Sequence, residues 1–154
     1  MRSRTTTRKP SRARWRSPWP RRWPPAAGAG PPRPGPARPD FLRAVAERVP
    51  AGDVRSGVRT AARMPEHTSI RHAAEVLGSG YRMSAPDTVP YALWCAAGHL
   101  DDLHEGLWPT VAGRGDIDTT CAIAGGVIAA RTGAASLPAA WHAAREPLPL
   151  AVYG

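Results

Sequence analysis

The first 39 residues of the chain contain no acidic residue, although they carry eleven of its 21 lysines and arginines. Residues 40 to 154 hold the other ten basic residues against all twelve acidic ones. The net charge of +9 therefore belongs to the N-terminal stretch, and the remainder has the charge balance of an ordinary globular protein. A length of 154 residues is enough for one domain rather than two.

Cysteine is also scarce, because Cys95 and Cys121 are the only two and form no CxxC pair that would suggest zinc. This count excludes a disulfide-rich scaffold, and we interpret both as reduced thiols of a cytoplasmic protein. No apolar run approaches the roughly 18 residues of a membrane-spanning helix, so no membrane contact is expected. Arg21 and Arg22 form a twin arginine, but the proline-rich stretch behind them is not the apolar part of an export signal.

Proline, arginine, glycine and alanine dominate residues 1–39 and leave no helix or strand period. Such a segment cannot bury enough apolar area to offset its ordering entropy, so we expect a disordered basic tail. Its arginines, with Trp15, Trp19 and Trp23, would suit an arm that binds nucleic acid. The composition favours the alternative, which is a solvated tail or GC-rich coding sequence read from the wrong start or frame.

From Asp40 onward, apolar residues recur at helical spacing between proline and glycine breaks, which predicts an all-α domain without strands. Asp40 and Thr68 are expected N-caps, Gly78 is an expected C-cap, and Pro90 is expected in the first turn of its helix. The expected helical segments are 40–49, 53–64, 68–78, 87–100, 101–113 with an interruption at Pro109, 118–132, and a last one beginning near Pro138.

The stretch GRGDIDTT, residues 113–120, places two carboxylates just before a run of small residues, CAIAGGVIAA. If the stretch is extended, Asp116 and Asp118 point to the same side with their Cα atoms about 7 Å apart. Both carboxylates could then converge on Mg²⁺ or Mn²⁺, and Thr119 could add a hydroxyl ligand. The alternative is a capped turn, in which Asp118 caps a helix that starts at Thr119.

The helix behind this loop contains Gly125 and Gly126 in its middle. Each glycine costs a helix about 1 kcal/mol relative to alanine. That cost predicts a packing reason, namely a second helix pressed against this face. A rigid helix in a dense core would also be a good support for a metal loop.

Together these residues resemble the signature of the ADP-ribosylglycohydrolases, of the dinitrogenase-reductase-activating glycohydrolase type. The family pattern is a GGDTDT-like loop, an AIAGG-like helix, and then a proline and a tryptophan. The chain has GRGDIDTTCAIAGGVIAA followed by SLPAAW. Upstream, LGSGYRMSAPDTVPYALW resembles the family's LG-x-G loop and the ETVP-like helix start behind it. VPAGDVRSGVRTAAR resembles its middle region, and the similarity covers residues 41 to 148.

The resemblance implies an all-α, partial helical bundle over residues 40–154, with two Mg²⁺ or Mn²⁺ ions in the complete family site. It also implies hydrolysis of the glycosidic bond between ADP-ribose and a modified protein or small acceptor. Asp116, Asp118 and Thr119 would be metal ligands, and Tyr81 and Ser84 would contact the ADP-ribose. No residue is assigned as the catalytic acid or base.

Several positions depart from the family pattern. Asp87, Arg114 and Ile117 replace the usual glutamate, glycine and threonine without removing a ligand. The family's N-terminal T-D-D cluster with its nearby glutamate is not found, and we interpret Asp101 and Asp102 as an N-cap and a solvated face. We therefore expect the C-terminal part of a glycohydrolase, truncated. An inactive fragment of the enzyme and a nucleic-acid-binding adaptor stay open as alternatives.

The remaining reactive side chains have simpler interpretations. The five histidines form no HxxxH or HExxH pair, so we expect them at surface or helix-cap positions. Cys121 has no recognisable base partner and is expected to pack rather than react. Trp94, Trp108 and Trp141 are expected in the core.

Overall fold

The structure is a computed structural model that describes residues 34–133, 137 and 139–146. Residues 1–33 of the expected tail lie outside these described residues. Over the described residues the chain forms seven α-helices and no strand, which confirms the all-α prediction. None of the described helices is long and apolar enough to cross a membrane. The helices are α1 Arg38–Arg48, α2 Asp53–Arg63, α3 Ile70–Leu77, α4 Ala85–Ala97, α5 Leu103–Ala112, α6 Ile117–Thr132 and α7 Ala139–Ala144.

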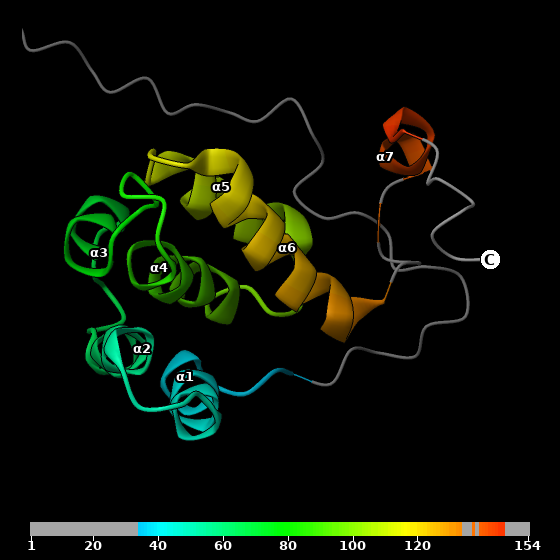
Figure 1. Ribbon diagram of the computed structural model, residues 1–154. Helices are drawn as coiled ribbons and strands as arrows, with labels where there is room; N and C mark the ends of the chain where they lie inside the picture. The colour runs from blue at the N-terminus through cyan, green and yellow to red at the C-terminus, as the bar shows by residue number, and fades with distance from the viewer. Residues whose placement is uncertain (1–33, 134–136, 138, 147–154) are drawn as a thin grey trace, which may run out of the picture.

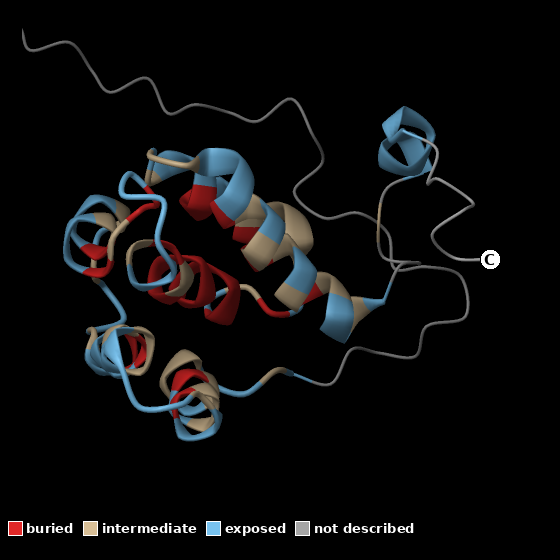
Figure 2. Ribbon diagram, viewed as in Figure 1, coloured by how far each residue is buried: buried red, intermediate tan, exposed pale blue. Residues whose placement is uncertain are grey.

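The bundle is arranged around α4, which packs against α1, α2, α3, α5 and α6 (Figure 1). The α1–α2 pair covers one side of α4, and the α5–α6 pair covers another. Every residue of α4 from Pro90 to Ala97 is buried, whereas the surrounding helices bury one side and expose the other (Figure 2). Among the described helices, α7 alone contacts no other helix.

The core is built from large apolar side chains that several helices direct at α4. Leu42 of α1, Val58 of α2, Tyr91 of α4 and Ile128 of α6 are all fully buried. Burial of an aliphatic or aromatic side chain of this size contributes about 1.5–3 kcal/mol to folding. These residues therefore hold the two helix pairs against the central helix.

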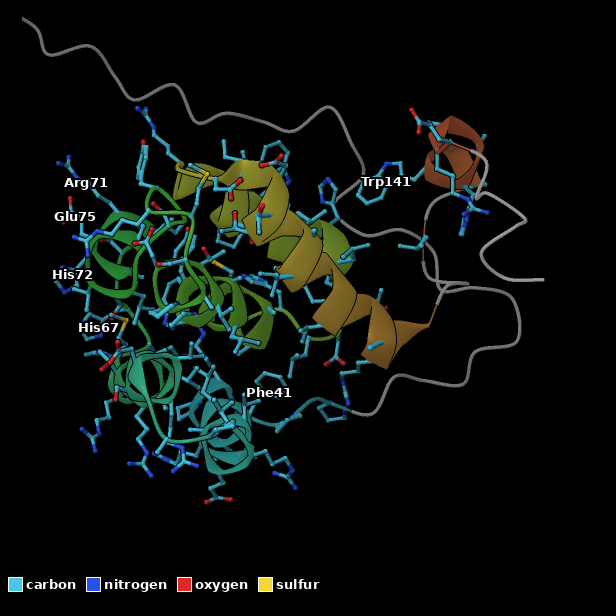
Figure 3. All side chains as sticks on the ribbon, in the orientation of Figure 1. Phe41, His67, Arg71, His72, Glu75 and Trp141 are labelled. Carbon is cyan, nitrogen blue, oxygen red and sulfur yellow. The ribbon has the colours of Figure 1, made fainter. Side chains whose placement is uncertain are left out.

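The prediction that three tryptophans lie in the core is correct for one of them. Trp94 of α4 is buried, but Trp108 and Trp141 are 42% and 39% exposed. Trp108 belongs to α5, and Trp141 belongs to α7, none of whose residues is buried (Figure 3). A large apolar side chain can therefore remain exposed when only one side of its helix packs against other helices, or when the helix packs against none.

The N-cap residues of α1 and α3 differ from those predicted. Helix α1 starts at Arg38, because Pro39 fits the first turn, where no backbone N–H partner is needed. Asp40 is therefore a first-turn residue paired with Arg43, not the N-cap. In α3 the cap is Ser69, whose hydroxyl accepts the His72 N–H at 3.2 Å. Gly78 does end this helix, as predicted.

Pro90 and Pro109 lie inside helices. The sequence had predicted Pro90 in the first turn of its helix and an interruption at Pro109. Helix α4 begins at Ala85, so Pro90 lies beyond its first turn. Its ring packs against Gly57 of α2, where an added Cβ would come within 2.5 Å of the proline Cγ. Pro109 does not interrupt α5, which continues through it to Ala112. Both rings are buried, so packing offsets the helix cost of a proline.

The paired glycines of α6 do not mark a close helix contact, contrary to the prediction. A Cβ on Gly125 would make ordinary contacts at 3.6 Å and beyond, and one on Gly126 would meet nothing within 4 Å. The close approach between α5 and α6 occurs instead at Gly106, where a Cβ would lie 2.3 Å from the Ile128 Cδ1.

The histidines divide between surface and partly buried positions. His67 and His72 are exposed and project outward beside Arg71 and Glu75, as expected (Figure 3). His99 is half-buried, and burial lowers its pKa. His99 directly follows Gly98, the C-cap residue of α4, so it lies at a helix-cap position rather than at the surface.

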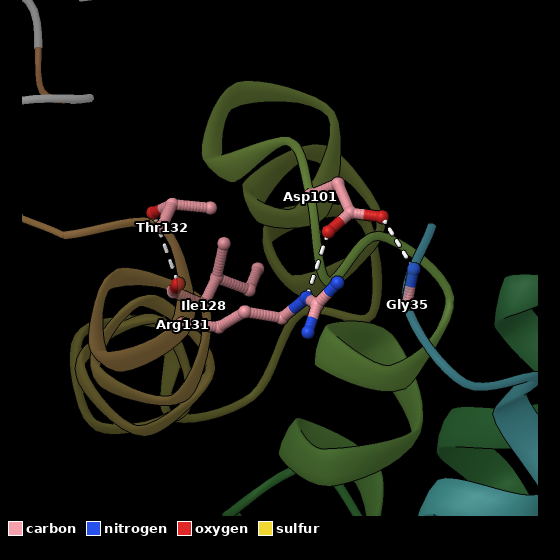
Figure 4. A network of polar contacts seen from close by, with 5 residues as sticks. All are labelled: Gly35, Asp101, Ile128, Arg131 and Thr132. Carbon is pink, nitrogen blue, oxygen red and sulfur yellow. Dashed lines mark hydrogen bonds and ion pairs between the residues drawn. The ribbon is translucent and has the colours of Figure 1, made fainter. Parts of the chain in front are cut away.

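Asp101 joins three separate parts of the chain (Figure 4). One carboxylate oxygen accepts the Gly35 N–H at 2.9 Å, and the other accepts the Arg131 Nε–H at 2.7 Å. Partial burial would raise the pKa of Asp101, but these two interactions outweigh it and the pKa lies below its usual 3.8. Asp101 is exposed, as expected of a solvated face, but its contacts with Gly35 and Arg131 were not predicted from the sequence.

We expect Asp101→Asn to lower the free energy of unfolding at neutral pH by up to about 1 kcal/mol, because the pair is partly exposed. The folded pKa lies below the unfolded one, so this stabilisation is present above the unfolded pKa of 3.8 and disappears as the pH falls through the folded pKa. Urea denaturation of both proteins at pH 7 and at about pH 2.5 checks this. A difference that persists unchanged at the lower pH would contradict it.

Candidate metal and substrate site

Residues 113–116 form the turn between α5 and α6. The backbone is not extended there, because Arg114 and Gly115 adopt φ values of 61° and 77°. Asp116 occupies the N-cap position, and Asp118 lies in the first turn of α6. The expectation that Asp118 caps a helix from Thr119 is therefore wrong. The helix start brings the two carboxylates together by another route, since the Asp118 side chain lies within hydrogen-bonding reach of Asp116.

The two carboxylates and the neighbouring hydroxyl face solvent. Asp118 and Thr119 are exposed and Asp116 is half-exposed. The pKa of Asp116 lies below its usual value, first because any proton bound by the two neighbouring carboxyl groups is held by Asp118 and shared with Asp116, and then because Thr119 donates hydrogen bonds to the Asp116 carboxylate. Thr120, in contrast, is buried, and its hydroxyl donates to the Asp116 carbonyl at 2.8 Å. Thr119 is thus the threonine that remains accessible to a ligand.

A second loop lies directly against this turn. The Asp116 N–H donates to the Ser79 carbonyl at 2.9 Å, which links the segment after α3 to the start of α6. The two segments approach each other so closely that neither Gly80 nor Gly115 has room for a side chain. A Cβ on Gly80 would lie 2.5 Å from the Asp116 Cβ, and one on Gly115 would lie 2.2 Å from the Ser79 carbonyl oxygen. The LG-x-G segment and the GRGDIDTT segment therefore form one surface.

This contact brings the expected substrate residues to the metal loop. Tyr81 follows Gly80 directly and is 74% exposed. Ser84 is exposed at the N-cap position of α4, and its side chain makes no capping hydrogen bond. Between them, Met83 is 86% exposed with a φ of 47°. The loop thus presents an aromatic ring, a thioether and a hydroxyl to solvent beside Asp116.

The Asp101–Asp102 pair cannot complete the same site. The Asp102 carboxylate caps α5 by accepting the Glu105 N–H at 3.1 Å, as predicted for an N-cap. Asp101 binds Arg131, at the C-terminal end of α6. Asp118 lies at the opposite end of that helix, about 20 Å away at 1.5 Å per residue. The pair and the metal loop are therefore separate features.

The described residues supply a limited set of ligands. Within residues 34–133, 137 and 139–146, no three His, Cys, Asp or Glu side chains gather closely enough to hold a metal ion. The described residues that could hold one at this surface are thus Asp116, Asp118 and Thr119. Cys121, one turn further along α6, is half-buried, and burial and then the Asp118 charge raise the pKa of its thiol. A thiol with a raised pKa is a poor nucleophile, in accord with a packing role.

The sequence interpretation missed the part played by Asp87. Its carboxylate accepts the Arg82 N–H at 2.7 Å, and its carbonyl accepts the Gly80 N–H at 2.9 Å. It therefore closes the loop that carries Tyr81. An acidic residue near the start of a helix, just after a glycine-rich turn, was the available signal for such a role.

Comparison with protein families supports this combination of loops and helices. Residues 26–151 match the model of the ADP-ribosylglycohydrolase family. The match begins at residue 26, within the segment expected to be a tail, and it includes both loops of the candidate site. Neither a curated protein nor a solved structure matches the chain significantly. The family match spans more than half of the sequence, and the chain therefore belongs to the ADP-ribosylglycohydrolase family.

Proposed function

We propose that this chain binds Mg²⁺ or Mn²⁺ through Asp116, Asp118 and Thr119, and that these ligands form one part of a site for hydrolysis of the glycosidic bond between ADP-ribose and an acceptor. The observation that carries the proposal is the Asp116–Asp118 pair, of which Asp118 is exposed and Asp116 is half-exposed against the Ser79–Gly80 backbone. Hard divalent cations prefer such oxygen ligands. The family match supports the hydrolase class.

The ligand set fits a divalent cation in its chemistry. Asp116 is ionised at neutral pH, and Asp118 and Thr119 face the same solvent region. The start of α6 disfavours a cation, because the N-terminus of a helix carries a partial positive charge. Two carboxylates supply four times that charge with the opposite sign, so the local field still attracts a cation. When bound, such an ion can orient ribose hydroxyls and activate a water molecule.

The residues of the second loop would bind and orient the substrate. The exposed Tyr81 ring offers a face for a base or ribose, and the Ser84 hydroxyl offers a hydrogen bond. Both lie on the loop that contacts Asp116 through Gly80. An ADP-ribose conjugate held by these groups would place its ribose near the two carboxylates. The assignment to the dinitrogenase-reductase-activating type stays a prediction, as does the alternative of a nucleic-acid-binding arm.

We expect Asp116→Ala and Asp118→Ala each to weaken Mn²⁺ binding by about tenfold or more, because each removes a charged ligand. Isothermal titration with MnCl₂ on the full chain measures this. Asp53→Ala is the matched control, since Asp53 is likewise an exposed aspartate in the first turn of a helix. It should leave the affinity unchanged.

Two outcomes would refute the ligand assignment. In the first, the full chain binds no Mn²⁺ at millimolar concentration. In the second, the Asp116 and Asp118 variants bind as well as the parent and the Asp53 variant. A loss of affinity confined to the two loop variants supports the proposal.

A further inference from the structure

Asp87 makes more contacts with the loop before α4 than helix capping requires. Its Oδ2 accepts the Arg82 N–H at 2.7 Å, and its carbonyl oxygen accepts the Gly80 N–H at 2.9 Å. Its Oδ1 lies against Gly78, where an added Cβ would come within 2.4 Å. The residue is half-buried between these contacts. It thus touches the loop at its beginning, middle and end.

Few interactions inside the loop itself support its shape. Gly78, Gly80 and Met83 all adopt positive φ values, so the backbone turns sharply three times within six residues. One turn hydrogen bond, from the Met83 N–H to the Gly80 carbonyl at 2.9 Å, lies wholly inside it. Tyr81, Met83 and their neighbours are exposed and contribute little packing. Its shape therefore depends on its contacts with Asp87 and with the backbone at Gly115 and Asp116.

The same loop determines the position of Asp116. Ser79 accepts the Asp116 N–H, and Gly80 packs against the Asp116 Cβ. A shift of the Ser79–Gly80 backbone would move the N-cap of α6 and the carboxylate that it carries. The contacts thus form a continuous path from Asp87 through Ser79 and Gly80 to Asp116.

We propose that Asp87 is a positioning residue for the metal loop, holding the 78–82 segment in the shape that orients Asp116. It lies beyond the ligands themselves and acts through the backbone of the neighbouring loop. Residues that orient metal ligands in this way typically affect metal affinity by about 10–100-fold. The metal readout rests on the function proposed above, whereas the positioning of Asp116 can be measured without metal.

The simpler alternative is that Asp87 only stabilises the start of α4. A carboxylate in the first turn of a helix is favourable, and Asp87 lies in that turn. Loss of a cap would lower overall stability without changing Asp116 in the folded protein. A second alternative is that the Asp87 charge attracts a cation through space. The experiment must therefore distinguish an effect on the position of Asp116 from an effect on overall stability and from an effect of the Asp87 charge.

Three variants make this separation. Asp87→Ala removes both the hydrogen-bond acceptor and the charge, whereas Asp87→Asn removes the charge but keeps an acceptor oxygen for Arg82. Asp102→Ala is the matched control, because it removes a carboxylate that accepts a backbone N–H at the start of α5. That cap lies at the opposite end of α5 from the turn that carries Asp116. If Asp87→Ala fails to fold, Asp87→Ser replaces it, since serine is still a good residue at a helix start but is one atom shorter.

Hydrogen exchange followed by NMR on the full chain without metal tests the positioning directly. We expect the Asp116 and Gly80 amides to exchange about tenfold faster in Asp87→Ala, and to stay near the parent rate in Asp87→Asn and Asp102→Ala. Equal acceleration of all amides in Asp87→Ala, or the same local effect in Asp102→Ala, would overturn the proposal. Unchanged exchange at Asp116 in Asp87→Ala would also overturn it.

Titration with MnCl₂ then tests the connection to metal binding. We expect Asp87→Ala to weaken binding about tenfold and Asp87→Asn to retain most of the affinity. Equal weakening by both variants would assign the effect to charge and overturn the positioning role in binding. If the parent binds no Mn²⁺ while exchange at Asp116 still depends on Asp87, the proposed metal function fails and the positioning of Asp116 stands.

Discussion

Gly80→Ala is expected to lower the free energy of unfolding by about 2–4 kcal/mol. Two costs add. The φ of Gly80 is 93°, a region that costs a residue with a side chain about 1–2 kcal/mol. The new Cβ would also lie 2.5 Å from the Asp116 Cβ, and forcing atoms apart in a packed contact costs about 1–3 kcal/mol. Urea denaturation followed by circular dichroism measures the difference.

Gly126→Ala is the matched control for this substitution. A Cβ at Gly126 would meet nothing within 4 Å, and the residue lies within α6. Because alanine is the better helix former by about 1 kcal/mol, this variant should be slightly more stable than the parent. A Gly80 variant as stable as the parent would mean that the two loops do not contact each other as described.

The helices were predictable from the sequence because their signals are local. Apolar spacing and the glycine at Gly78 placed the segments, and the structure confirms seven helices over the described residues. The first residues of the helices were less predictable, because adjacent residues can each serve as the N-cap. Ser69 caps α3 in place of Thr68, and Pro39 moves the start of α1 upstream. Pro90 and Pro109 remain within helices because burial outweighs their local cost.

The candidate site was predictable only in part. The residue pattern pointed to Asp116, Asp118 and Thr119, but it assumed an extended strand-like geometry. The actual proximity of the carboxylates comes from a helix start. The contact between Ser79 and Asp116 joins segments far apart in the sequence, and no local rule predicts such a pairing. Gly125 was also misleading, because α5 does lie against it but leaves room for a Cβ, so the contact does not require glycine.

We expect the 154-residue chain to release no measurable ADP-ribose from an ADP-ribosylated arginine or serine peptide in the presence of Mg²⁺. The proposed metal loop offers two carboxylates and one hydroxyl, whereas the resemblance to the family implies two divalent ions in a complete site. Two such ions about 4 Å apart repel each other by on the order of 15 kcal/mol at an effective dielectric constant of 20. Two carboxylates on one side of the pair are too few to offset this repulsion. One ion at most should therefore bind at this surface.

A positioned acid or base is the second requirement, and it typically contributes about 10²–10⁴-fold to the rate. Near Asp116, the carboxylate of Asp87 already accepts the Arg82 N–H and lies against Gly78. Asp101 and Asp102 lie at the other end of α6, so they cannot reach the same ribose. The parent and the Asp116→Ala variant should therefore be equally inactive in an assay for released ADP-ribose. Turnover by the parent that disappears in the variant would contradict this, and it would identify Asp87 as the first residue to test for proton transfer.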